Sequence, residues 1–130
     1  MSADVPVVFA RWERFVAWLL DRTEKFPRRV AFTFRTRIDN LALDVFERLV
    51  EARYQRDREP TLRQVNLDIE KLRLLLRLSH DQRILDDKAF AHACGELAVV
   101  GRMIGGWRNQ QLAGVSRGRR WRRRPVRSSG

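Results

Sequence analysis

Cysteine and histidine are scarce in this 130-residue chain, and their scarcity excludes several kinds of site. The single Cys94 cannot form an internal disulfide or a cysteine-based zinc site, and His80 and His92 are the only histidines. No apolar run approaches the roughly 20 residues that cross a bilayer. Charged residues lie close to the N-terminus, where a signal peptide would need an apolar stretch. We therefore expect a cytoplasmic protein that does not enter a membrane.

The sequence also lacks the residue patterns of common enzyme classes. Gly101 and Gly106 have the spacing of a phosphate-binding loop, but Trp107 and Arg108 follow where Lys and Ser or Thr are required. The Glu-x-x-His pairs that hold di-iron sites in helical bundles do not occur. Cys94 falls on the apolar side of a predicted helix, as a small core residue would. We therefore predict no catalytic residue, no metal site and no cofactor.

Acidic residues are outnumbered, and lysine is rare among the basic ones. The chain has 27 basic and 16 acidic residues and a formal net charge of +11. Three of the basic residues are lysines and 24 are arginines. A GC-rich genome would favour Arg over Lys, but it would not produce the excess of basic over acidic residues. Arginine binds phosphate through a planar fork of donors and stacks on flat rings, so the composition favours a nucleic-acid partner.

Apolar residues make up 44% of the chain, and their spacing predicts four helices. The first covers about residues 7–25 and the second about residues 29–57, although residues 30–34 would also suit a short extended piece. The third begins at Thr61, a predicted N-cap that Gln64 completes as a capping box. The fourth begins after Asp86 or Asp87. Short links between helices favour an all-α, antiparallel up-and-down four-helix bundle over residues 1–113.

The third helix has two apolar sides, where a helix in a lone bundle needs only one. The first side, at Leu62, Val65, Ile69, Leu72 and Leu76, is the predicted core stripe, and the second contains Leu67, Leu74 and Leu78. Trp18 likewise widens the apolar stripe of the first helix. Because large apolar patches rarely stay bare, we predict that Trp18, Leu67, Leu74 and Leu78 form an oligomer interface.

The C-terminal segment, residues 114–130, is predicted to be a flexible, basic tail. Residues 117–130 contain seven arginines and no acid, which accounts for +7 of the net charge. An arginine-rich run with an aromatic residue can contact phosphates and stack on unpaired bases. Six residues form the predicted contact: Arg119, Arg120, Trp121, Arg122, Arg123 and Arg124. A solvated tail or a targeting sequence would have the same composition.

Several stretches of residues 8–110 resemble one family. They are EKFPR at 24–28, RIDNLAL at 37–43, EARY at 51–54, LRLLLRL at 72–78 and GRMIGGW at 101–107. Together they resemble the accessory variability determinant (Avd) of diversity-generating retroelements. The bundle proteins encoded in ribosomal-RNA intervening sequences are a related set.

The resemblance implies a homopentamer of four-helix bundles with a strongly positive surface. It also implies association with the retroelement's reverse transcriptase and template RNA, in support of the error-prone cDNA synthesis that leads to mutagenic retrohoming. Five arginines become candidates for contact with nucleic acid or the polymerase: Arg28, Arg53, Arg73, Arg77 and Arg102. We expect some arginines of the bundle to pair with acids, namely Glu24, Asp44, Glu47, Glu51 and Glu70. Two alternatives stay open, namely an orphan RNA-binding bundle and an adaptor for an acidic protein.

Overall fold

The computed structural model describes the backbone of residues 4–123 and the side chains of residues 7–110. The four α-helices are α1 (Asp4–Glu24), α2 (Thr36–Tyr54), α3 (Glu59–Asp81) and α4 (Asp87–Arg123). A 3-10 turn, η1 (Arg28–Val30), and a π-helical turn, η2 (Ala31–Arg35), join α1 to α2. No strand occurs within the described backbone, so the prediction of an all-α protein with four helices is confirmed.

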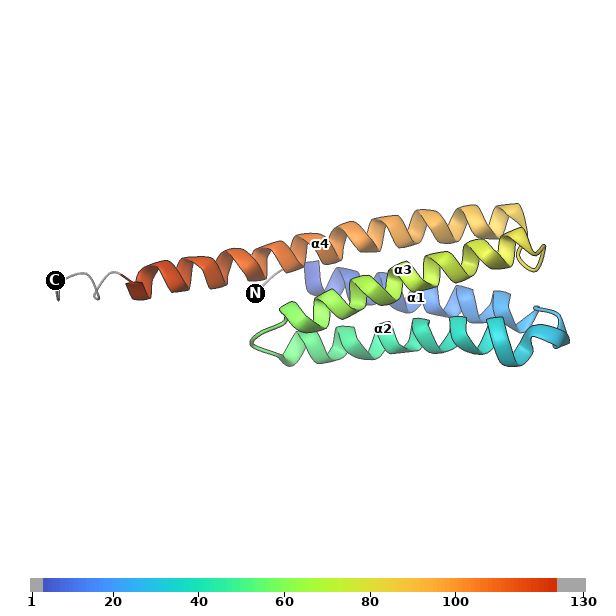
Figure 1. Cartoon of the computed structure of the whole chain (residues 1–130), viewed down its shortest axis with the longest axis horizontal. Coiled ribbons are helices and arrows are strands. Elements are labelled where there is room, and N and C mark those ends of the chain that lie inside the picture. The colour runs from blue at the N-terminus through green and yellow to red at the C-terminus, as the bar shows by residue number, and fades with distance from the viewer. Residues whose placement is uncertain (1–3, 124–130) are drawn as a thin grey trace.

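Each helix packs on two others around the bundle. α2 contacts α1 and α3, and α4 contacts α3 and α1. Contacts join the start of α3 to the far part of α4, through Arg108 and Glu59, and the end of α3 to the start of α4, through His80 and Asp87. α3 and α4 therefore run in opposite directions, and Figure 1 shows each helix beginning at the end of the bundle where the previous one stops.

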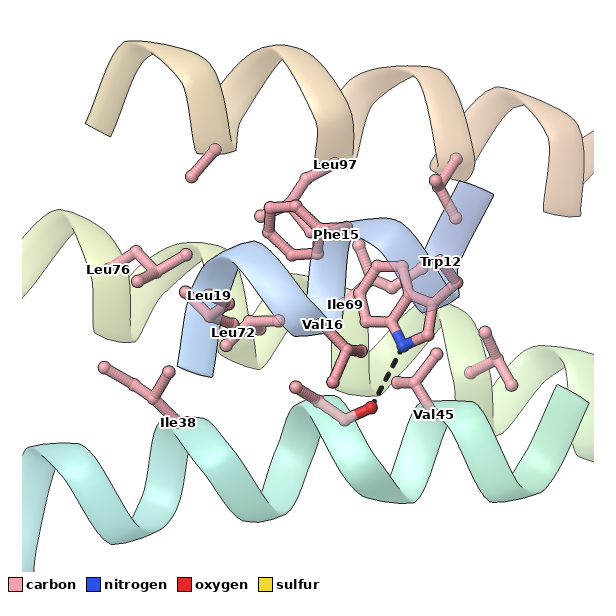
Figure 2. Packing of buried hydrophobic residues seen from close by; sticks show 14 of the residues in the cluster. Trp12, Phe15, Val16, Leu19, Ile38, Val45, Ile69, Leu72, Leu76 and Leu97 are labelled. Atoms are coloured by element: carbon pink, nitrogen blue, oxygen red, sulfur yellow. Dashed lines mark hydrogen bonds between the residues drawn. The ribbon is translucent and has the colours of Figure 1, made fainter. Parts of the chain in front are cut away.

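One apolar stripe from each helix fills the centre of the bundle. The predicted stripe of α3 is buried at all five positions, from Leu62 to Leu76. On α1, Trp12 is fully buried, and its indole Nε1 donates a hydrogen bond of 3.0 Å to the carbonyl oxygen of Ala42 on α2. Figure 2 shows Trp12 close to Phe15 and within the same cluster as residues of the other three helices. Without this bond, the buried indole N–H would have no hydrogen-bond acceptor, which would destabilise the fold.

The N-terminal start of the second helical region is helical rather than extended. Residues 30–34 lie in η1 and η2, so the alternative of a short strand there is wrong. Val30 is buried and Phe34 packs partly against the core, and these two contacts fix the segment. Tertiary packing here outweighs the β preference of Val30, Phe32 and Thr33.

The predicted capping box at the start of α3 is wrong. The helix begins at Glu59, with Pro60 in its first turn, where a proline's missing N–H costs nothing. Thr61 is therefore already helical, and its hydroxyl donates to Gln55 Oε1 at 2.6 Å. The Gln64 amide donates to Asp68 Oδ1 at 2.9 Å instead of reaching back to Thr61. α2 ends at Tyr54, several residues before Pro60.

The connection from α3 to α4 contains a left-handed residue and a helix cap. Arg83 has φ of 60° and is the one described non-glycine residue with positive φ. The next amide, that of Ile84, donates to the carbonyl oxygen of Ser79 at 2.8 Å. Asp86 Oδ1 accepts from the amide of Ala89 at 2.7 Å, which confirms an aspartate cap and selects Asp86 over Asp87.

α4 places Ala93 rather than Cys94 in the core, and Cys94 is half-buried beside it. Leu97, Val100, Ile104 and Trp107 of α4 are buried, and Phe90 is half-buried. The backbone of α4 continues past Gly114 to Arg123, whereas the apolar pattern stops near Gly114. The division into a bundle (1–113) and a tail (114–130) stays a prediction.

Candidate nucleic-acid and partner interface

The five candidate arginines of the bundle lie on four different elements and do not form one cluster. Arg28 lies on η1 at one end of the bundle, and Arg53 lies in the last turn of α2 at the other. Arg73 and Arg77 lie one turn apart on α3, and Arg102 lies on α4. Arg73 is half-buried and the other four are exposed. Any ligand that contacts all five must therefore extend around the bundle or bind to more than one copy.

The candidates differ in whether an acid already neutralises them. Arg73 forms an ion pair of 3.2 Å with Glu70, one turn earlier on α3. Arg53 stands over the ring of Tyr54, with 5.8 Å between the guanidinium carbon and the ring centroid. Among the described residues, no ion pair involves Arg53 or the other three candidates, which are Arg28, Arg77 and Arg102. In the described part of the chain, these last three have neither an acidic partner nor a ring contact, so their guanidinium groups are the most available to bind phosphate.

Other arginines hold the helices together and are less available to a ligand. The guanidinium of Arg11 on α1 donates two bonds of 3.1 Å to Glu96 on α4. Arg48 on α2 pairs with Asp68 on α3, whose side chain is only 3% exposed. Arg108 on α4 pairs with Glu59 at the start of α3. Such pairs join residues that are distant in sequence, so their arginines are part of the fold.

The second apolar side of α3 borders a groove between α2 and α3. Leu67, Leu74 and Leu78 are 49%, 54% and 45% exposed. One pocket of 480 Å³ is lined by Leu74 and by three charged residues, Arg37, Asp44 and Lys71, whereas Leu67 lies outside it. The adjoining pocket of 260 Å³ contains Leu78 and shares Arg37 with the first. The interface role of these leucines stays a prediction, and the groove with charged residues of both signs is a feature that the sequence did not indicate.

Trp18 lies on a different face from those leucines, so the four predicted interface residues do not share one surface. It is half-buried between α1 and α4, with its ring centroid 5.7 Å from that of Phe15 and 4.5 Å from that of His92. The guanidinium carbon of Arg22 lies 5.5 Å from the ring centroid. A partner could therefore reach only part of the Trp18 side chain.

Phe32 is an exposed aromatic residue that the sequence analysis did not select as a site. It lies on η2, and its side chain is 91% exposed. A signal was present in the sequence: residues 25–37 contain five basic residues and no acid. Helical periodicity could not show that Phe32 faces water, because η2 departs from α-helical spacing.

Three further findings limit what kind of site the described residues can form. Within the described residues, no group of three or more His, Cys, Asp or Glu side chains could hold a metal ion. No described helix is long and apolar enough to cross a membrane. The side chains of Arg119, Arg120, Trp121, Arg122, Arg123 and Arg124 lie outside the described residues, so their binding role stays a prediction.

Comparison with known proteins identifies one family. A family model described as bAvd-like matches residues 6–111, which include all but the first two residues of α1, the whole of α2 and α3, and the part of α4 that packs in the bundle. No curated protein and no solved structure matches the chain.

Proposed function

Because this chain belongs to the bAvd-like family, we propose that it is the non-catalytic accessory protein of a diversity-generating retroelement. In this role it binds the reverse transcriptase together with the template RNA or its cDNA, and it supports mutagenic retrohoming. The family match over residues 6–111 is the observation that carries the proposal. The polymerase chemistry belongs to the reverse transcriptase.

The surface charge supports a nucleic-acid partner. Arg28, Arg77 and Arg102 are exposed and have no acidic partner among the described residues, so each can neutralise a phosphate. Each phosphate contact releases bound counterions, which makes affinity fall with salt by about 0.7 logarithmic units per contact for a single strand. Spread over three elements, these arginines suit a long and flexible polyanion better than a compact ligand.

The groove between α2 and α3 supports assembly into an oligomer, with the pentamer of the family as the proposed form. Leu67, Leu74 and Leu78 keep about half of their surface in contact with water in the single chain. Covering such apolar surface with another subunit removes it from water, which stabilises the oligomer. Arg77 lies beside Leu74 and Leu78 on α3, so assembly would repeat the same basic residue around the oligomer.

The test is a pull-down of the tagged chain from cells that express the neighbouring retroelement genes, with and without ribonuclease. Recovery of a reverse transcriptase with its RNA supports the proposal, and loss of the enzyme after ribonuclease shows that RNA joins the two. Structured RNA without a polymerase contradicts it in favour of an orphan RNA-binding bundle. An acidic protein alone contradicts it in favour of an adaptor.

A matched pair of variants tests the arginine assignment. The first variant replaces the unpaired Arg28, Arg77 and Arg102 with Gln, and the second replaces Arg35, Arg63 and Arg73, which have acidic partners at 3.8, 3.7 and 3.2 Å. Both lose three positive charges. Titration of RNA at several salt concentrations should show the salt slope falling by about two units in the first variant and less in the second. Equal changes would show that only net charge matters.

A further inference from the structure

The corner between α1 and α2 exposes an aromatic ring that nothing in the bundle covers. Phe32 is 91% exposed, whereas its neighbours Val30 and Phe34 pack against the core. The corner lies at the end of the bundle opposite the α2–α3 connection (Figure 1). Exposed phenylalanine is common enough as an isolated residue, so the ring gains meaning only from what surrounds it.

The segment that presents Phe32 is held in place by its own hydrogen bonds. The Thr36 hydroxyl donates to the carbonyl oxygen of Ala31 at 2.8 Å, and the Thr33 hydroxyl donates to that of Val30 at 3.4 Å. Each bond joins a residue after Phe32 to a residue before it, and Val30 anchors the segment in the core. The ring is therefore presented from a fixed backbone, which lowers the entropy that a ligand must overcome.

Basic residues flank Phe32 in the sequence, and no acid lies among them. Residues 25–37 contain Lys25, Arg28, Arg29, Arg35 and Arg37. Arg28, Arg29 and Arg35 lie within four positions of Phe32 in the sequence, on the same two short helical turns, η1 and η2. Of the five, only Arg35 forms an ion pair among the described residues, at 3.8 Å from Asp39.

The first acid after residues 25–37, Asp39, already has two partners. Asp39 Oδ1 accepts a hydrogen bond of 2.6 Å from the Thr23 hydroxyl on α1, in addition to its contact with Arg35. Arg28 and Arg29 are both exposed, with no acidic partner in the described part of the chain. The corner therefore combines an open ring face with two guanidinium groups whose charge is not compensated.

We infer that this corner binds single-stranded nucleic acid by stacking an unpaired base on Phe32, with Arg28 and Arg29 on the adjoining phosphates. The inference rests on the proposed nucleic-acid function and adds that the bound nucleic acid is single-stranded. Single-strand binding sites combine aromatic faces for bases with basic side chains for the backbone. A duplex keeps its base faces stacked inside, so it cannot use the ring. A second copy would bring the same positive charges toward these arginines, which disfavours self-pairing at this corner.

The experiment compares the full-length chain with Phe32→Leu and Phe32→Trp. Binding is measured to a 12-nucleotide single-stranded RNA carrying 2-aminopurine and to a duplex of equal length. Phe32→Leu should weaken single-strand binding by about 5- to 150-fold and abolish quenching of 2-aminopurine, while duplex binding stays unchanged. Phe32→Trp should keep both. Leu43→Ala is the control, because it shortens another exposed apolar residue, 40% exposed, on α2.

Each other outcome has a definite meaning. Single-strand binding by Phe32→Leu equal to that of the wild type overturns the inference and leaves the proposed function intact. Equal losses for single strand and duplex overturn stacking, since a duplex offers no free base. A change in oligomer mass on sedimentation would make Phe32 a subunit contact and overturn the inference. Wild-type protein that binds neither RNA overturns the proposed function as well.

Discussion

Two buried tryptophans that differ in one hydrogen bond allow a sharp test of the packing described above. Trp12 is fully buried and donates to the carbonyl oxygen of Ala42 at 3.0 Å. Trp107 is 2% exposed, and its Nε1 is a buried donor without a partner in the described structure. We predict that Trp12→Phe destabilises the fold clearly, whereas Trp107→Phe is close to neutral.

The magnitudes follow from what each substitution removes. Replacing indole by phenyl removes two carbons and the N–H, a loss of about 1.5 kcal/mol of apolar contact at either site. At Trp12 the lost hydrogen bond adds about 1 kcal/mol, for a total of about 2.5 kcal/mol. At Trp107 the change also removes an unpaired buried donor, which returns about 1 to 3 kcal/mol. The two variants should therefore differ by about 2 to 4 kcal/mol in free energy of unfolding.

The assay is urea unfolding followed by circular dichroism, at several protein concentrations so that assembly is separated from folding. The dependence on urea should keep the same slope in all three proteins, because the surface exposed on unfolding hardly changes. Equal destabilisation by the two substitutions would refute the reasoning, because it would show that the Trp12 bond and the unpaired Trp107 donor have no net effect.

Three further changes test the turn, the cap and the C-terminal segment. Arg83→Gly should stabilise the fold by about 1 kcal/mol, since glycine adopts a φ of 60° without a Cβ clash, and a raised melting temperature would show it. Asp86→Ala should cost about 1 kcal/mol in urea unfolding, because the amide of Ala89 loses its acceptor. Deleting residues 114–130 removes seven arginines and should weaken RNA binding at low salt; unchanged affinity would contradict a binding role.

Much of the bundle could be predicted because burial repeats at helical spacing. The stripe from Leu62 to Leu76 is a local property of one segment, and all five positions are buried. The start of α3 could not be read in the same way. Thr61 and Gln64 match a capping box, but Pro60 is accepted in the first turn and the helix begins earlier, at Glu59. The sequence around Pro60 is compatible with a helix start at either position, and the structure has the longer helix.

The sequence could predict which residue types form the candidate site, but it could not predict how they are arranged in space. The excess of arginine is visible in the sequence, but the ion pairs that use some of it join residues such as Arg11 and Glu96, 85 positions apart. Of the five acids that we expected to neutralise arginines, Glu70 does so, whereas the other four form no ion pair among the described residues. Four acids that the sequence did not single out pair with arginines instead: Asp39, Glu59, Asp68 and Glu96. Which arginines remain unpaired depends on helix packing, which periodicity alone does not specify.

The order of the helices has a consequence for how fast the chain folds. Three of the main helix contacts, α1 with α2, α2 with α3 and α3 with α4, join successive helices through short connections. Contacts of this kind close small loops, and chains dominated by them fold in microseconds to milliseconds. Only the contact of α1 with α4, which includes the Arg11–Glu96 pair, must close a loop of most of the bundle. We therefore expect formation of that contact, which carries the largest loop-closure entropy, to limit the folding rate.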